Sequence, residues 1–557
     1  MLFIRKIGGK NMKKLAKLLL VLGMVLAMAA CSNDSGKDQG GDGVQTTFTY
    51  AIGGEPEYLD PAVGSDSVTS YVTNQMYYPL FRIGPNGATV NEACVSYEES
   101  TNADGKPVYT FKLTEENYWS DGEKVTAHHY VYGMLRSLGM GGADSYYSYF
   151  IADYVLNAKA HSIAMSDVAD MTDVGIKALD DYTIEITLES STPYFVNLMT
   201  AGVFYPARED YMPEHDMTWA DDPTVPTNGP FQTTKIDRAS EVVMVKNEYF
   251  PKADEVSVET MTAKIMSDMD AQLMAFQTGE IDFATSLNSN VTQIYAGKEE
   301  LLIDDSVINY FVLLNSYNDE VPALQDARVR RALALGIDRS VIVTALDAGD
   351  AYYELHGLVP NGFDGIDGDF RAEADAEEKL VYTDKEEAKR LLAEAGYDAS
   401  NPLKITYYYN QSAMHDTVAE VLKAQWAEIG VEATLKTGEI RTFFDDRDNA
   451  LFEAARHAMS ADYMDPTTYL DMPTSWSQVQ QSWGDETYDQ MILDSRLASG
   501  DDRIQQLHDA EAYLIAEQSY AIPLFGYKSI SLAKAGTTGA ETNPQGNYYY
   551  WYVKVPA

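Results

Sequence analysis

The chain contains the stretch Val-Tyr-Thr-Phe-Lys-Leu at residues 108–113, followed closely by Tyr-Trp-Ser-Asp-Gly at residues 118–122. The first stretch is short and rich in β-branched and aromatic residues, a pattern that predicts a β-strand. Further strands of this kind are predicted at Thr46–Ile52, Thr183–Leu188, Glu241–Lys246, Asn309–Leu314 and Lys404–Tyr409. Short strands are therefore expected along the whole chain.

Helical patterns lie between these strands. Thr383 and Glu386 have capping-box spacing and Gly396 stands where a C′ glycine belongs, which predicts a helix over Asp384–Ala395. Apolar residues at helical spacing predict three more helices: Asp326–Leu335, Asp416–Glu428 and Asp502–Glu517. Alternating strands and helices without a long repeat indicate an α/β fold. A single core rarely exceeds about 250–300 residues, so a 557-residue chain is expected to have at least two.

The composition excludes some functions. The chain carries 85 Asp and Glu against 41 Lys and Arg, a formal net charge of −44. This charge repels phosphate backbones and no basic stripe offsets it, so nucleic acid is not an expected partner. The two cysteines exclude a disulfide scaffold and multi-cysteine metal motifs. Cys94 is expected to be buried and inert.

The N-terminus resembles a secretion signal. Four lysines precede the apolar run Leu18–Ala30, which is too short to span a bilayer. Small residues before Cys31 resemble a lipobox, so residues 1–30 are expected to be a signal peptide and Cys31 the lipidation site. The alternative is an ordinary secretory signal with a free Cys31. The polar stretch that follows predicts a flexible tether, giving a lipid-anchored segment over 31–45.

Catalytic and cofactor motifs are missing from the sequence. There is no phosphate-binding glycine loop, no nucleophile elbow and no His-Glu-x-x-His pair. The adjacent His128 and His129 point in different directions on any regular element, so packing or surface roles are expected for them. Asp364, Asp367 and Asp369 lack calcium-loop spacing and are interpreted as an acidic loop. No enzyme activity, metal or cofactor is predicted.

Several segments, taken in order, are similar to one family. They are Leu59–Pro61, Phe111–Leu113 with Tyr118–Gly122, Gly175–Asp181 with Thr183–Leu188 and Pro193–Phe195, Asn228–Phe231, Gly279–Asp282, Asp326–Leu333, Leu391–Tyr397 and Arg456–Pro466. In this order they resemble the oligopeptide-binding proteins of bacterial ABC importers, the family 5 extracellular solute-binding proteins. The resemblance runs from about Thr46 to the C-terminus.

The resemblance implies a two-lobe, periplasmic-binding-protein-like (Venus flytrap) α/β fold with an extra α/β subdomain inserted in lobe one. The implied boundaries are 46–77, 174–306 and 526–557 for lobe one, 78–173 for the inserted subdomain and 307–525 for lobe two. A ligand is expected between the lobes.

The resemblance also implies charged contacts for a peptide. Asp462 matches the family's Ala-Asp-Tyr aspartate and is expected to pair with the peptide α-ammonium, since a desolvated ammonium needs a charge partner. A structural carboxylate at a strand end is the alternative. Arg456 is expected to meet the carboxylate of peptides of one length. His415 is expected to meet the carboxylate of a longer peptide, or else to be a surface residue at a helix start.

Other positions are implied to line the cleft. Ala458 and Ser460, with Ser65 and Ser67 opposite, are expected to hydrogen-bond the peptide backbone. Tyr132 matches a cleft tyrosine. The chain departs from the family where two pocket tryptophans are replaced, by Met459 and Ile440. Methionine adapts its shape, so the side-chain pockets are expected to be more pliable.

The sequence thus predicts a monomeric, lipid-anchored receptor on the outer face of the cytoplasmic membrane. It is expected to capture oligopeptides and deliver them to ABC permease subunits. Alternatives are the same fold binding a sugar, a metal chelate or another nutrient, a receptor for a peptide signal, and a hydrolase on this scaffold.

Overall fold

A computed structural model describes residues 43–285, 287–317, 321–477 and 482–557. The proposed signal peptide, Cys31 and most of the tether lie outside the described residues. No helix within the described ranges is long and apolar enough to cross a membrane.

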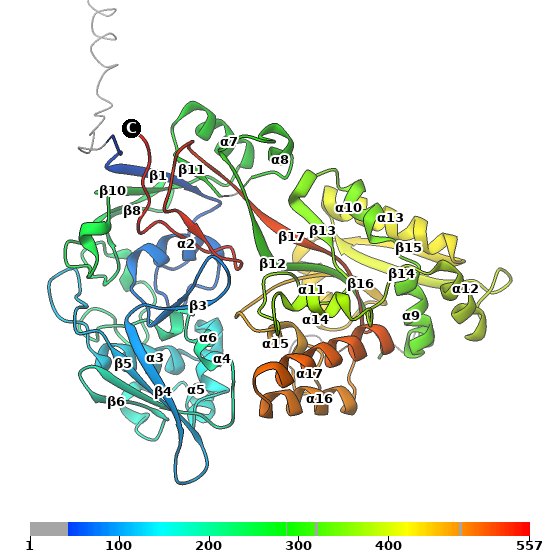
Figure 1. Ribbon diagram of the computed structural model, residues 1–557, viewed down its shortest axis with the longest axis horizontal. Helices are drawn as coiled ribbons and strands as arrows, with labels where there is room; N and C mark the ends of the chain where they lie inside the picture. Colours follow the sequence, from blue (N-terminus) through cyan, green and yellow to red (C-terminus); the bar gives the residue numbers. More distant parts are fainter. Residues whose placement is uncertain (1–42, 286, 318–320, 478–481) are drawn as a thin grey trace, which may run out of the picture.

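One large mixed sheet runs through the molecule in the order β15-β14-β16-β12-β17-β11-β1-β10-β9-β8, with β13 paired to β17 (Figure 1). Its strands are β1 (Thr47–Ile52), β8 (Phe231–Asp237), β9 (Glu241–Lys246), β10 (Thr260–Ile265), β11 (Phe283–Ala284), β12 (Leu301–Leu314), β13 (Tyr352–Glu354), β14 (Leu403–Asn410), β15 (Val431–Gly438), β16 (Ala454–Ser460) and β17 (Ala521–Ala533). The strands predicted from β-branched and aromatic residues at β1, β9, β12 and β14 are confirmed.

The long antiparallel strands β12 and β17 connect the two halves of the molecule (Figure 1). Their register is regular up to the pair Asp305–Lys528. It is interrupted between this pair and Asn309–Gly526, and it shifts again between Tyr310 and Phe311. A break in the ladder locally changes strand direction and twist. This crossing is therefore the point where one half of the sheet turns relative to the other.

Two separate cores lie on either side of this crossing. The first collects buried apolar residues of segments 48–283 and 533–555, and the second those of 307–525. Tyr463 packs in the first core although its sequence neighbours belong to the second. Ile83 packs in the second core although its sequence neighbours belong to the first. These two exceptions mark where the halves pack on each other.

A second, antiparallel sheet has the order β4-β5-β7-β6. Its strands are β4 (Cys94–Thr101), β5 (Pro107–Leu113), β6 (Ile176–Asp180) and β7 (Thr183–Thr187). The implied boundary at residue 173 cuts through this sheet, because β7 pairs with β5 from Val108–Thr187 to Lys112–Thr183. The structure therefore places β6 and β7 with the inserted sheet rather than with the large one. Two-residue and three-residue strands form small pairs elsewhere: β2 (Phe81–Ile83) with β3 (Thr89–Asn91), and β18 (Glu541–Thr542) with β19 (Tyr548–Tyr549).

Helices cover these sheets. They are α2 (Ser67–Met76), α3 (Ala127–Asp144), α4 (Tyr149–Ala152), α5 (Ala158–Ala164), α6 (Phe195–Leu198), α7 (Met269–Thr278), α8 (Val291–Ile294), α9 (Ala327–Leu335), α10 (Arg339–Ala345), α11 (Phe370–Ala376), α12 (Lys385–Glu394), α13 (Ala413–Glu428), α14 (Ile440–Asp448), α15 (Thr467–Leu470), α16 (Glu486–Leu497) and α17 (Gly500–Ala512). The four predicted helices are present as α9, α12, α13 and α17.

Aspartates start many of these helices. The N-cap carboxylates that accept a backbone N–H in the first turn are Asp66, Asp268, Asp326, Asp338, Asp369, Asp384 and Asp485. A carboxylate there satisfies an orphan donor and complements the helix dipole. Part of the acidic composition thus has a structural role, including Asp369 of the acidic loop.

The capping box predicted for α12 is wrong. Asp384 caps the helix by accepting from Glu387 N at 2.9 Å, while Thr383 Oγ1 donates instead to the Ile337 carbonyl at 2.7 Å. Gly396 has φ +92°, the left-handed backbone expected after a helix C-terminus.

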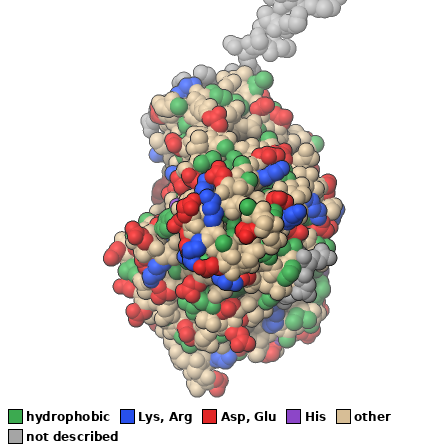
Figure 2. Space-filling model, turned by 90° about the vertical axis from the view of Figure 1, so that its right-hand side faces the viewer, with side chains coloured by type: hydrophobic (Ala, Val, Ile, Leu, Met, Phe, Trp, Pro, Cys, Tyr) green, Lys and Arg blue, Asp and Glu red, His purple; other side chains and the backbone are tan. Residues whose placement is uncertain are grey.

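Acidic and basic side chains are intermixed on the surface. Figure 2 shows Lys and Arg side chains lying among Asp and Glu side chains on one face. On α12, Lys389 pairs with Glu386 at 2.8 Å and Arg390 with Glu387 at 2.6 Å. Exposed pairs of this kind contribute little to stability.

Candidate ligand-binding site

Strand β16 has an open edge. On one side it pairs with β12 from Leu314–Ala454 to Ile308–Ser460, whereas on the other side its pairing with β14 ends at Tyr408–Ala455. The Met459 N–H donates to Asn309 Oδ1 at 3.0 Å, so it points toward β12. Because successive peptide groups of a strand point to opposite sides, the backbone groups of Ala458 and Ser460 face the open side.

Asp462 stands just beyond the end of β16. Its carboxylate accepts from Tyr149 Oη at 2.9 Å and Tyr147 Oη at 3.4 Å. Burial raises the pKa of Asp462, and the two tyrosine hydrogen bonds lower it. Among the described residues no Lys, Arg or His forms an ion pair with this carboxylate. Asp462 is therefore a desolvated acid held by neutral donors, which favours a cation as its ligand.

Arg456 stands near the other end of the same strand. Its side chain is buried, Nε donates to Asn410 Oδ1 at 2.7 Å, and the guanidinium lies 5.3 Å from the Phe443 ring centroid and 5.6 Å from that of Phe444. Burial lowers the pKa of Arg456. In the part of the chain that the structure describes, no carboxylate pairs with it. A buried guanidinium held by an amide and aromatic faces is suited to an anionic ligand group.

His415 lies beside Arg456. The helix α13 begins three residues before its predicted start, with Ser412 as N-cap, so His415 falls in the first turn and is buried rather than exposed. Its Nδ1 lies 3.1 Å from Tyr310 Oη. Burial, and secondarily the charge of Arg456, lower the pKa of His415 to about 4. The imidazole is therefore neutral at pH 7.

The other residues expected to line the cleft differ in exposure and in the element that carries them. Ser65 and Ser67 are exposed on either side of the N-cap of α2. The Tyr132 hydroxyl donates to the Met212 carbonyl at 2.9 Å, and its ring borders a surface hollow. Ile440 begins α14 and is 50% exposed. Met459 is half-buried on β16 itself.

Sequence reasoning missed the tyrosines that contact Asp462. They belong to an aromatic run, Tyr146–Phe150, whose rings pack on one another. The density of aromatic residues in that run is the signal that could have identified it.

The segment carrying Asp462 is anchored in the first core. The Tyr463 ring stacks on Tyr194 at 5.2 Å between centroids and meets Phe150 edge-on at 5.9 Å. Asn197 Nδ2 donates to the Met464 carbonyl at 3.1 Å. Asp462 is thus positioned by both halves of the molecule.

The acidic loop near Asp367 is braced by protein contacts. Glu373 accepts from the backbone N–H groups of Ile366 and Asp367 at 2.7 and 2.8 Å. Within the described ranges the loop aspartates do not form a metal-ligating group.

Comparison with known proteins identifies the family. The family model described as "Bacterial extracellular solute-binding proteins, family 5 Middle" matches residues 95–481. The chain belongs to this family. This family 5 solute-binding protein aligns with the two relatives described next along nearly their whole length. It is 29% identical to the periplasmic oligopeptide-binding protein OppA of Salmonella typhimurium, covering 96% of this chain and 97% of the relative.

Other relatives agree with this assignment. The family 5 protein is 27% identical to the dipeptide-binding protein DppE of Bacillus subtilis, covering 96% and 98% of the two chains. It is 26% identical to the crystallised substrate-binding domain of an oligopeptide ABC transporter from Bacillus anthracis, with a TM-score of 0.70 and coverage of 92% and 99%. The two-lobe α/β fold and the family expected from the sequence are confirmed.

Proposed function

We propose that this protein captures short peptides in extended form and delivers them to an ABC permease. The observation that carries the proposal is the open edge of β16. At one end it has an acid, and at the other a buried guanidinium, and neither has a partner of opposite charge among the residues that the structure describes. These are Asp462 and Arg456. The peptide-binding names of its relatives support the same ligand class.

A peptide zwitterion is complementary to this arrangement. Its ammonium pairs with Asp462, its carboxylate with Arg456, and its backbone adds a strand at Ala458 and Ser460. The peptide then runs antiparallel to β16. Main-chain hydrogen bonds do not depend on the peptide's sequence, so recognition rests on the two charged ends and on the backbone.

The separation of the charged residues limits peptide length. Residues six apart in an extended chain are at most about 20 Å apart. A peptide engaging both Asp462 and Arg456 is therefore no longer than about six residues. Because His415 is neutral at pH 7, it can meet a longer peptide's carboxylate only as a hydrogen-bond donor.

Closure of the two lobes buries the ligand in this proposal. The register break between Asp305 and Asn309 supports a hinge on β12, and Gly526 marks the matching position on β17. Lobe one then comprises about 46–77, 188–306 and 526–557, and lobe two 307–525. The inserted subdomain comprises about 78–187, extended from the sequence-based boundary to keep β6 and β7 with their sheet. Hinge closure around a ligand is a common response in two-lobe proteins.

The remaining parts of the proposal concern location and partners. Residues 1–30 direct secretion, Cys31 carries the lipid, and the following tether holds a monomeric receptor at the outer face of the cytoplasmic membrane. No bond is made or broken during capture, so the protein is not an enzyme.

Calorimetric titration tests the peptide claim. Free tri- to hexapeptides are compared with the same peptides after N-acetylation and after C-amidation. Binding of the free peptides alone supports both charged contacts. Equal affinity for free and acetylated peptides contradicts the role of Asp462, and absence of any binding contradicts the ligand class.

A further inference from the structure

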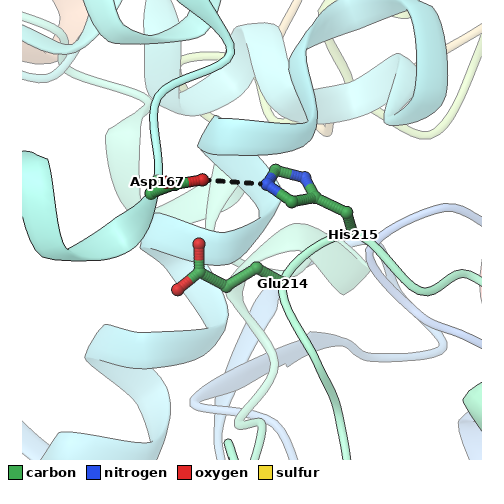
Figure 3. Close-up of side chains that lie close together, drawn as sticks. All are labelled: Asp167, Glu214 and His215. Atoms are coloured by element: carbon green, nitrogen blue, oxygen red, sulfur yellow. Dashed lines mark hydrogen bonds and ion pairs between the residues drawn. The ribbon is translucent and has the colours of Figure 1, made fainter.

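Three side chains of types that can ligate a metal ion lie close together at the surface. Figure 3 shows Asp167 and His215 facing each other, with the Glu214 carboxylate beside them. The ligand atoms all lie within 4.8 Å of one another, and His215 Nε2 is 3.1 Å from Asp167 Oδ1. We propose that Asp167, Glu214 and His215 bind a divalent transition-metal ion, for which Zn²⁺ is the best match.

The donor set supports this choice of metal. One imidazole nitrogen and two carboxylates are ordinary Zn²⁺ ligands, whereas Ca²⁺ and Mg²⁺ prefer oxygen alone. Ligand atoms about 2.1 Å from one ion are at most roughly 4.2 Å apart. Rotation of the exposed Asp167 side chain or the half-buried Glu214 side chain closes the remaining distance. Three protein ligands leave a fourth position for water.

Buried contacts hold the segment that carries two of the ligands. The Arg136 guanidinium donates from Nε to the Pro213 carbonyl at 3.0 Å and from Nη2 to the Asp216 carbonyl at 2.9 Å. Arg136 is itself buried against Asp60, with 2.5 Å between Nη2 and Oδ2. The backbone on both sides of Glu214 is therefore held before any ion arrives. Preorganised ligands reduce the entropic cost of binding.

The third ligand is joined to this segment by Glu214. Its Oε2 accepts from the Val168 N–H at 3.1 Å, next to Asp167 in the chain. Asp167 precedes β6 of the inserted sheet, while Glu214 and His215 lie in a later loop. A bound ion would therefore tie two distant segments together.

The electrostatics of the surrounding hollow favour a cation. The hollow has a volume of about 860 Å³, and its lining includes Glu209 and Asp216 as well as the three ligands. No Lys or Arg is part of that lining. A concave surface of one charge sign concentrates ions of the opposite sign.

This group differs from an ordinary acidic patch because it includes an imidazole, and from other His–Asp pairs because it has a third ligand. Two other His–Asp pairs lie on the surface, His161–Asp173 at 2.8 Å and His128–Asp181 at 3.6 Å. Within the described residues neither has a third ligand in reach. These pairs serve as internal controls.

Zinc titration of the full chain, purified without a polyhistidine tag, tests the proposal. Calorimetry is expected to show one Zn²⁺ per protein, with affinity at least about tenfold weaker in His215→Ala and Asp167→Asn. His161→Ala is expected to bind as the parent does. Far-ultraviolet circular dichroism without zinc checks that each variant is folded.

A second readout is thermal stability. Because an ion that binds only the folded state stabilises it, zinc is expected to raise the melting temperature of the parent and of His161→Ala. His215→Ala is expected to show a smaller rise. Equal zinc affinity in the parent and His215→Ala, equal affinity for Zn²⁺ and Mg²⁺, or no zinc binding at all would overturn the proposal. None of these outcomes depends on peptide binding.

Discussion

The Tyr149 hydroxyl donates to Asp462 over 2.9 Å and joins the inserted subdomain to a segment of the second lobe. This bond and the longer one from Tyr147 are hydrogen bonds to a carboxylate that has no cationic partner among the described residues. Neutral hydroxyls stabilise a buried charge less than a cation does. A cationic ligand group would therefore stabilise this carboxylate more than the two hydroxyls do.

Asp462→Asn is expected to weaken binding of free-amine peptides at least about thirtyfold, which corresponds to a loss of about 2 kcal/mol. The substitution keeps the side-chain shape and removes the charge. Calorimetry with free and N-acetylated peptides measures the effect. Glu432→Gln, an exposed neutralisation on β15, is the control and should leave affinity unchanged. An Asp462→Asn variant that still prefers free amines would contradict the anchor.

Peptide affinity is expected to fall at acid pH, starting above the range where an ordinary carboxyl titrates. Burial raises the pKa of Asp462, and protonation removes the charge that the ammonium needs. Tyr149→Phe removes a hydrogen bond that lowers this pKa, so the fall should begin at a still higher pH. Titrations from pH 8 to pH 4 compare the two proteins. Coincident profiles would contradict the role of the hydroxyl.

Arg456→Met is expected to weaken the binding of short peptides with a free carboxylate about tenfold or more. The affinity for the C-amidated forms of the same peptides should not change. The reason is the loss of a charged hydrogen bond to the peptide carboxylate. Stability should be unchanged or slightly higher, because the variant no longer buries a guanidinium without an anion. Urea unfolding and calorimetry measure the two effects. An equal loss of affinity for amidated and free peptides would contradict a contact between Arg456 and the peptide carboxylate.

Much of the fold followed from local sequence patterns. Val108–Leu113 and Lys404–Tyr409 were recognisable as strands because β-branched and aromatic residues fit a pleated surface. Helix starts were less reliable: the box at Thr383 failed because a neighbouring aspartate competes for the same N–H groups. The domain boundary at residue 173 missed the pairing of β7 with β5, which is a long-range contact that no local pattern encodes.

The site was only partly predictable, for a similar reason. Asp462 and Arg456 lie on one continuous segment that resembles the family, so the chain itself places them together. Tyr147 and Tyr149 come from a distant helical turn, and only folding brings them to the carboxylate. The burial of His415 also depended on a helix that begins three residues before its predicted start.

Acid is expected to destabilise the fold through His415. Its pKa is about 4 in the folded protein and about 6.5 when unfolded, so between these values the unfolded chain binds a proton that the folded one excludes. Stability is complete above pH 6.5 and declines as the pH falls toward 4. From pH 7 to pH 5 the loss attributable to this group is roughly 2 kcal/mol.

Urea unfolding at the two pH values measures this loss, and His415→Gln should reduce it. His128→Gln is the control, since that side chain is 64% exposed in the folded state. An unchanged pH dependence in His415→Gln would contradict the expected contribution.

Gly526→Ala is expected to destabilise the crossing between the lobes by about 1–3 kcal/mol. A Cβ at this position would lie 2.2 Å from Tyr353 Cζ, far inside contact distance. Tyr353 cannot move freely, because its hydroxyl accepts the Asn361 N–H at 3.0 Å. In a Tyr353→Ala background the clash is absent, so the same glycine substitution should cost at least about 1 kcal/mol less. A double-mutant cycle by urea unfolding measures this coupling. Additive effects would show that the strand at Gly526 shifts to accommodate the methyl group, and that the close packing on Tyr353 does not hold the β12–β17 crossing in place.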